Sequence, residues 1–293
     1  MATPGPRPEL PAPRVVWPEG FAARLEAFVP RVAARRERRE GAGSGSLLGA
    51  GEEFVGHRPY RAGEDLRRLD WGLLARSDQP FVRRTRREAA ESWAVVLDTS
   101  ASMGLGEPGK LSAGATLAAA VAAVGARGGA TVQVVTGAAP PLEVRRGAPL
   151  GRLLEGLGSL EAGGSGGLAE LLGSWRPPNG CGFVVVVGDL VGAEPRDLAP
   201  WERPGRELAL AQVLAPEELA PPQEGVVRWF DPEGEGSRLA GGADAMRRYD
   251  HRLEAWLEAW ARAAGRPGLR WSVGSSAVPF EERARAILEG GNG

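Results

Sequence analysis

Cysteine, histidine and lysine are scarce in this chain of 293 residues. A single cysteine, Cys181, excludes an intrachain disulfide framework and a zinc site built from several thiolates. The only two histidines, His57 and His251, argue against a histidine-rich metal site. Lys110 is the only lysine, so arginine supplies almost all of the positive charge.

Long apolar runs are also missing. No run approaches the ~20 residues that a helix needs to cross a bilayer. Residues 1–30 lack the hydrophobic region of a signal peptide. We therefore expect a cytoplasmic protein with no membrane span.

The overall composition is that of an ordinary globular protein. Apolar residues make up 43% of the chain and charged residues 25%, which rules out wholesale disorder and is enough to fill a core. The formal net charge is -1. Residues 1–90 nevertheless hold 17 Arg against 12 Asp and Glu, an excess that hints at an interaction surface. The excess is too mild to argue for nucleic acid.

The first third of the chain differs from the rest. Residues 1–18 are rich in Pro and Ala and indicate a flexible or polyproline-like arm. Residues 21–40 have apolar side chains close to helical spacing, which predicts an amphipathic helix that ends at a stretch rich in Gly and Ser. The domains that we expect are an arm and helix over 1–45, an Arg- and aromatic-rich lobe over 46–91, and an α/β domain over 92–293.

Strand and helix patterns alternate regularly from Ser92 onward. Strands are predicted at 93–97, 131–136, 142–146 (an antiparallel edge strand), 183–187, 208–214 and 269–273, with a small hairpin at 226–230 and 236–239. Helices are predicted at 110–127, 150–157, 167–175, 244–264 and 279–288. This alternation predicts the α/β class, with a doubly wound, mostly parallel sheet covered by helices on both faces.

Three polar features follow elements of this predicted sheet. Asp98, Ser100 and Ser102 come directly after the first strand, a glycine-rich loop surrounds Ser165, and Asp189 follows the strand 183–187. Ligands of open parallel sheets bind beyond the carboxyl ends of the strands. Hard oxygen donors of this kind suit Mg²⁺ or Mn²⁺ and disfavour zinc or copper. Taken singly, each feature has a plainer interpretation, as a helix cap or a loop.

These residues resemble a known type of site. Asp98-x-Ser100-x-Ser102, a hydroxyl residue in a Gly-Gly-x loop and a later Asp resemble the metal-ion-dependent adhesion site of von Willebrand factor A-type domains. The segment upstream is similar to the bacterial domain of unknown function 58 family, whose members usually accompany MoxR-type AAA+ ATPases. The residues that carry this second resemblance are Phe54, Arg58, Tyr60, Gly63, Glu64, Asp65, Arg67, Asp70, Trp71, Ala75, Arg76, Glu88 and Met103.

The resemblance implies a role for each oxygen ligand. Ser100 and Ser102 would bind the ion through their hydroxyls, and Asp98 and Asp189 would act directly or through water. Ser165 would stand where these domains usually have threonine. Leu190 follows Asp189, where many such domains have glycine. The position left open on the ion would accept a carboxylate from a partner protein.

The resemblance also bears on the lobe over residues 46–91. Its alternation of charged and aromatic residues indicates either a solvated salt-bridge surface or a packed lobe that serves as a partner surface. The candidate partner-binding residues in this lobe are Arg58, Tyr60, Arg67, Asp70, Trp71 and Arg76.

Two enzymatic alternatives have matching features. Residues 104–110 match the first seven positions of a phosphate-binding loop, but Leu111 stands where such a loop needs Ser or Thr. A haloacid-dehalogenase-type phosphatase needs an acid two residues after its first Asp, and Ser100 occupies that place. We therefore expect a non-enzymatic, Mg²⁺-dependent interaction module that serves as an adaptor for a MoxR-type ATPase. A metal-dependent hydrolase using the same ligands, and a purely structural domain, remain the alternatives.

Overall fold

The computed structural model describes residues 13–43, 52–59, 70–77, 79–87, 91–137, 139–163, 167–222, 226–230 and 237–290. The chain divides into two compact units. The large unit combines residues 1–38 with residues 92–293, and the small unit comprises residues 39–91. Each unit is described by itself.

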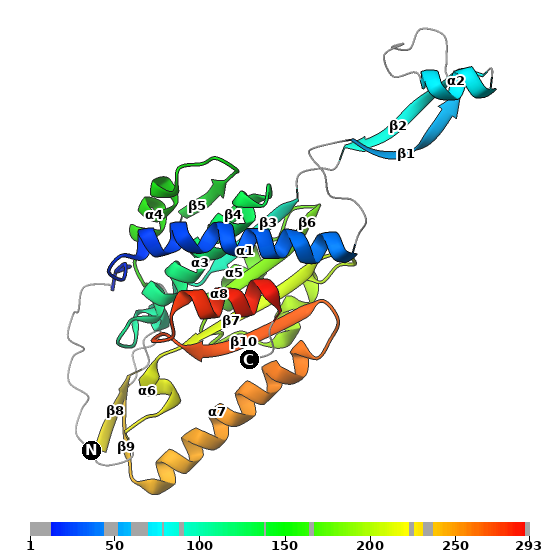
Figure 1. Ribbon diagram of the computed structural model, residues 1–293. Helices are drawn as coiled ribbons and strands as arrows, with labels where there is room; N and C mark the ends of the chain where they lie inside the picture. The colour runs from blue at the N-terminus through cyan, green and yellow to red at the C-terminus, as the bar shows by residue number, and fades with distance from the viewer. Residues whose placement is uncertain are drawn as a thin grey trace. The chain divides into compact units, whose positions relative to one another are not determined.

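A six-stranded sheet forms the centre of the large unit (Figure 1). Its spatial order is β10-β7-β6-β3-β4-β5, and every neighbouring pair is parallel except β4 and β5. The predicted class, a doubly wound and mostly parallel α/β sheet, is confirmed and is consistent with a von Willebrand factor A-like fold. The strands are β3 (Ser92–Leu97), β4 (Thr131–Thr136), β5 (Ala139–Val144), β6 (Cys181–Gly188), β7 (Glu207–Leu214) and β10 (Leu269–Ser275).

The central strands are buried on both faces because their sequences are continuously apolar. Successive side chains of a strand point to opposite faces. In β3, Val95 packs into the core of one face and Val96 into the core of the other, and Val185 and Val186 of β6 divide in the same way. A strand exposed on one face would instead alternate apolar and polar residues.

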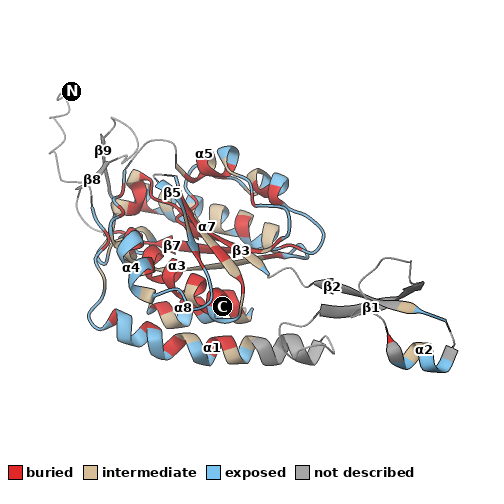
Figure 2. Cartoon of the chain, turned by 90° about the horizontal axis from the view of Figure 1, so that it is seen from above, coloured by how far each residue is buried: buried red, intermediate tan, exposed pale blue. Residues whose placement is uncertain are grey.

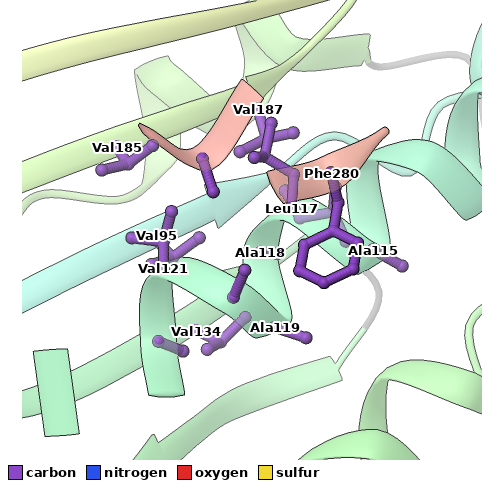
Figure 3. Close-up of a cluster of buried hydrophobic side chains, with 14 of the residues drawn as sticks. Val95, Ala115, Leu117, Ala118, Ala119, Val121, Val134, Val185, Val187 and Phe280 are labelled. Atoms are coloured by element: carbon purple, nitrogen blue, oxygen red, sulfur yellow. The ribbon is translucent and has the colours of Figure 1, made fainter. Parts of the chain in front are cut away.

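Helices rich in small apolar residues cover the first face of the sheet. Helix α3 (Lys110–Arg127) packs its alanines directly on the strands, and Ala118 and Val121 lie against Val95 in Figure 3. Helices α4 (Leu150–Gly158) and α8 (Phe280–Glu289) also lie in this layer. The opposite face is covered by α5 (Gly167–Ser174), the 3-10 helix η3 (Pro195–Trp201) and α7 (Ala243–Ala264).

The predicted amphipathic helix is α1 (Phe21–Gly43), and it joins the first face. Phe28 is 1% exposed and its ring contacts Phe280 of α8 edge-to-face at 5.5 Å. Arg24 forms two hydrogen bonds with Glu281, of 2.8 Å and 2.6 Å. Figure 2 shows buried and exposed residues alternating along α1. The apolar spacing in the sequence therefore reflects packing on the α/β domain.

The end of the predicted arm is ordered against the same unit. The Val15 N–H donates to the Leu160 carbonyl and the Ala162 N–H donates to the Pro13 carbonyl. Residues 13–15 are therefore hydrogen-bonded to residues 160–162, which lead into the glycine-rich loop. Residues 1–12 lie outside the described residues.

The small unit contains a two-stranded antiparallel sheet and one helix. Strands β1 (Glu52–Pro59) and β2 (Phe81–Arg87) pair with each other, and α2 (Trp71–Ser77) lies between them in the sequence. They form their own sheet, separate from the six-stranded one.

Three further short elements, two strands and a helix, belong to the large unit. The predicted hairpin is present as β8 (Val226–Phe230) and β9 (Ser237–Gly241), and α6 (Pro216–Leu219) follows β7. Among the described residues, no helix combines the length and the hydrophobicity that crossing a bilayer requires.

Candidate functional site

The first part of the candidate site is the loop that follows β3. Asp98, Ser100 and Ser102 are 2%, 5% and 4% exposed; the first two precede the short 3-10 helix η2 (Ala101–Gly104), and Ser102 lies within it. The Ser100 N–H donates to Asp98 Oδ1 at 2.9 Å. The hydroxyl oxygens of Ser100 and Ser102 lie 3.0 Å apart. The three predicted ligands of this motif therefore share one buried turn.

The neighbouring strand β6 closes tightly on Asp98. The Asp98 N–H donates to the Val187 carbonyl at 2.8 Å. Gly188 is so close that a Cβ at its position would lie 2.7 Å from the Asp98 Cβ. Glycine is therefore required here by the close approach of the Asp98 side chain. Asp189, the next residue, follows β6 at the same edge of the sheet as Asp98.

The glycine-rich loop begins beside the same turn. The Gly163 N–H donates to the Thr99 carbonyl at 2.8 Å, which links the loop to the Asp98–Ser100 turn. Ser165, the predicted hydroxyl ligand of this loop, lies outside the described residues.

Asp189 is engaged in a buried cluster of charges with Lys110 and Glu218. It is fully buried, its Oδ1 accepts the Val191 N–H at 2.9 Å, and its Oδ2 lies 2.8 Å from the Lys110 ammonium. The same ammonium lies 2.8 Å from Glu218 Oε1. Whether Asp189 also contributes to ion binding stays a prediction.

The turn after Asp189 has the backbone that glycine adopts most readily. Leu190 has a φ of +63°, in the left-handed region, which costs ~1–2 kcal/mol for a residue with a side chain. Its side chain is 1% exposed and packs in the core of the second face. Burial of the leucine therefore offsets the backbone cost of this turn.

The Lys110 ammonium is held charged despite its burial. Loss of solvation lowers the pKa of Lys110, but the negative charges of Asp189 and Glu218 and their hydrogen bonds more than offset this, so its pKa lies above the ordinary value. The cluster extends to α7, because the Tyr249 hydroxyl donates to the Glu218 carbonyl at 2.7 Å. Burial, with the charges of Glu218 and Asp250, raises the pKa of Tyr249 to about 12.

The residues of the β3 turn fit a small divalent cation. Magnesium prefers octahedral oxygen ligands at ~2.0–2.1 Å, so two neighbouring ligands lie about 3.0 Å apart. The separation of the Ser100 and Ser102 hydroxyls is 3.0 Å. Within the described residues, no three His, Cys, Asp or Glu side chains are grouped to hold one metal ion. An ion here would therefore depend on serine hydroxyls together with Asp98.

The lysine, the histidines and the cysteine, which were considered for other kinds of chemistry, do not belong to the β3 turn. Lys110 is fully buried and paired with two carboxylates, which disfavours a role in binding the phosphates of a nucleotide. His251 is exposed on α7, and Cys181 is buried at the start of β6. The side chain of His57 lies outside the described residues.

The candidate partner-binding residues belong to the small unit. Asp70 caps the N-terminus of α2, since its Oδ1 accepts the Leu73 N–H at 3.0 Å. Arg76 is exposed and donates to the Gly72 carbonyl within the same helix. Trp71 begins α2, Arg58 lies in β1, and Tyr60 and Arg67 lie outside the described residues.

Sequence reasoning missed Glu218 and the role of Lys110. Both residues have a feature in the sequence from which their place in the site could have been predicted. Lys110 is the only lysine and begins a helix whose other residues are almost all apolar or small. Glu218 follows a buried strand at the same edge of the sheet as Asp98 and Asp189, which is the rule that identified those two residues.

Comparison with known proteins identifies a family of related sequences. The family model described as "Protein of unknown function DUF58" matches residues 56–255. The uncharacterized proteins Rv1480 of Mycobacterium tuberculosis and Mb1516 of Mycobacterium bovis are each 32% identical to this chain over 189 residues. These alignments cover 60% of this chain and 58% of each relative. The chain thus spans less than two thirds of the curated relatives that it matches.

Two solved structures are similar over much of their length. The conserved hypothetical protein BatB from Bacteroides thetaiotaomicron aligns with a TM-score of 0.37 and 14% identity, covering 68% of this chain and 96% of that chain. An aerotolerance-related membrane protein from Bacteroides fragilis aligns with a TM-score of 0.38 and 16% identity, covering 68% and 97%.

Proposed function

Because the chain belongs to the DUF58 family, whose description assigns no activity, we propose its function from the geometry of the β3 turn. The protein is a non-enzymatic interaction module that binds a partner through Mg²⁺ or Mn²⁺. The ion is held by the hydroxyls of Ser100 and Ser102 and by Asp98. The observation that carries this proposal is the 3.0 Å separation of two buried hydroxyls beside a buried carboxylate.

The donor set explains why the ion would attract a partner. Hydroxyl ligands carry no charge, so an ion held by two of them and one carboxylate keeps a net positive charge. When bound, the ion supplies this charge to an acidic side chain from outside, while the chain's own residues orient the ion and limit its access to water. A partner that offers Asp or Glu therefore gains by completing the shell.

The resemblance to proteins that accompany MoxR-type AAA+ ATPases supports the choice of partner. We propose that the partner is such an ATPase, or a client that the chain presents to it as an adaptor. The Arg- and aromatic-rich small unit, with Arg76 and the α2 helix, is the second surface that we propose for this contact.

Binding of the ion is tested by calorimetric titration of Mn²⁺ into the wild type and Asp98→Ala. We expect a single site in the wild type that is lost in the variant. Added Mn²⁺ should also raise the melting temperature of the wild type, because an ion that binds only the folded state stabilises it. A wild type that shows neither heat nor thermal shift would contradict ion binding.

Partner binding is tested with the double variant Ser100→Ala/Ser102→Ala. We expect this variant to keep its fold but to lose Mg²⁺-dependent capture of a purified MoxR-type ATPase. Ser159→Ala is the matched control, because Ser159 is exposed directly after the end of α4 and its hydroxyl donates to the Gly156 carbonyl within the same turn. Metal-dependent phosphatase activity that disappears in Asp98→Ala would instead favour a hydrolase.

A further inference from the structure

Lys110 contributes a permanent positive charge beside one of the predicted metal ligands. Its side chain is 0% exposed, and it begins α3 directly after the loop that leads from the β3 turn. Its ammonium lies 2.8 Å from a carboxylate oxygen of Asp189 and 2.8 Å from one of Glu218. A buried charge is tolerated only with such partners, because burial removes the water that would otherwise solvate it.

Both carboxylates of this cluster have their oxygens engaged. Asp189 accepts the Val191 N–H on Oδ1 and the Lys110 ammonium on Oδ2. Glu218 accepts the Lys110 ammonium on Oε1 and the Ala215 N–H on Oε2, at 2.7 Å. The Asp189 carbonyl in addition accepts the Gln212 amide at 3.0 Å. Asp189 is therefore held both at its carboxylate and at its backbone carbonyl.

The β3 turn is built differently. Its hydroxyls bond to each other and carry no charge, so an ion can take their lone pairs without breaking an ion pair. An ion that took Asp189 Oδ2 would have to displace the Lys110 ammonium from its 2.8 Å hydrogen bond there and leave that buried charge with Glu218 as its remaining carboxylate partner. Removing one partner of a buried ion pair is destabilising, because it leaves the buried charge less well compensated.

We propose that Lys110 is the resident counter-charge of Asp189, so that a divalent ion at Asp98, Ser100 and Ser102 binds without Asp189. This inference rests on the proposed function and specifies its metal site. Lys110 acts as a positioning residue that weakens binding of the free ion, since two cations close together repel. The bound ion has one carboxylate fewer, so it keeps more attraction for the carboxylate of a partner.

The test is a titration of Mn²⁺ into the full chain and three variants. Lys110→Met/Asp189→Asn removes one positive and one negative charge together, so the net charge of the cluster is unchanged. We expect this double variant to bind Mn²⁺ within about threefold of the wild type, whereas loss of a ligand or its support costs about 10–100-fold. Lys110→Met alone frees Asp189 and should bind Mn²⁺ about tenfold more tightly. Asp98→Asn should abolish binding.

Each outcome separates this inference from the proposed function. A loss of tenfold or more in the double variant, with binding that still depends on Asp98, would show that Asp189 is a ligand and overturn the inference alone. Binding by Lys110→Met but not by the wild type would support the inference and overturn the Mn²⁺ dependence of the natural protein. No binding by any of the proteins would overturn both. The double variant decides the question by itself if Lys110→Met does not fold.

Discussion

The close approach of Gly188 to Asp98 makes a sharp test of the candidate site. A Cβ at Gly188 would lie 2.7 Å from the Asp98 Cβ and 3.1 Å from its Oδ2. Real side chains do not approach so closely, so Gly188→Ala must push Asp98 away or separate β6 from β3. Both strands lie in the centre of the sheet, where such a shift disturbs the packing on both faces.

The expected size of the effect follows from overpacking in other cores. Inserting a methyl group into a filled site costs about 1–3 kcal/mol. For a unit of this size each kcal/mol lowers the melting temperature by about 2–4 °C, so the fall should lie in the range of roughly 2–12 °C. The displaced Asp98 should also weaken Mn²⁺ binding by about tenfold or more.

Gly125→Ala is the matched control for this substitution. A Cβ at Gly125 in α3 would collide with the Trp93 ring, so this variant also overpacks the core. We expect it to melt at a lower temperature with an unchanged Mn²⁺ affinity. The measurements are calorimetric melting and Mn²⁺ titration of both variants. A Gly188→Ala protein with the melting temperature and Mn²⁺ affinity of the wild type would disprove the geometry on which the site rests.

Three further predictions concern stability and pH. In a Tyr60→Phe variant, the single remaining tyrosine, Tyr249, should ionise with a pKa of about 12, measured by absorbance at the phenolate band. Burial raises the pKa of Glu281, but its hydrogen bonds and its ion pair with Arg24 lower that pKa below the ordinary 4.5. The ionised Glu281 therefore stabilises the folded protein fully above pH 4.5, and this stabilisation is lost as the pH falls through the pKa of the folded state. Glu281→Gln should accordingly destabilise the protein less at pH 4 than at pH 7. Phe28→Ala should cost about 3–5 kcal/mol in urea unfolding, because Phe28 is buried between α1 and α8.

The controls for these predictions are also available in the chain. Glu26→Ala changes an exposed position of α1 and should leave the free energy of unfolding nearly unchanged. A Phe28→Ala effect as small as that of Glu26→Ala would mean that α1 is not part of the core. A Tyr249 pKa near 10 would mean that its hydroxyl is exposed. An effect of Glu281→Gln that does not shrink on acidification would remove the ion pair as its cause.

Strands and helices of the large unit were predictable because each has a strong local pattern. The apolar runs of β3 and β6 and the alanine-rich helix α3 were assigned from the sequence, and α3 has the predicted bounds. The docking of α1 against α8 was not predictable. Its apolar spacing showed that one face is buried, but a partner about 250 residues away leaves no trace in local periodicity.

The candidate site was predictable in part for the same reason. Asp98, Ser100 and Ser102 are two residues apart, and the strand before them places them at the edge of the sheet. Asp189 was assigned to that edge by the same rule. The ion pairs that Lys110 forms with Asp189 and Glu218 could not be predicted from the sequence. They depend on side-chain directions that only the packed sheet and helices define.

The order of residues along the chain was thus sufficient for the α/β architecture and for a polar turn rich in hydroxyls, since hydrophobic periodicity and residue chemistry are local properties. The packed molecule was needed to learn which charges are already paired. Lys110 reaches Asp189 across 79 residues and Glu218 across 108, and such contacts form because the parallel strands end at one edge of the sheet.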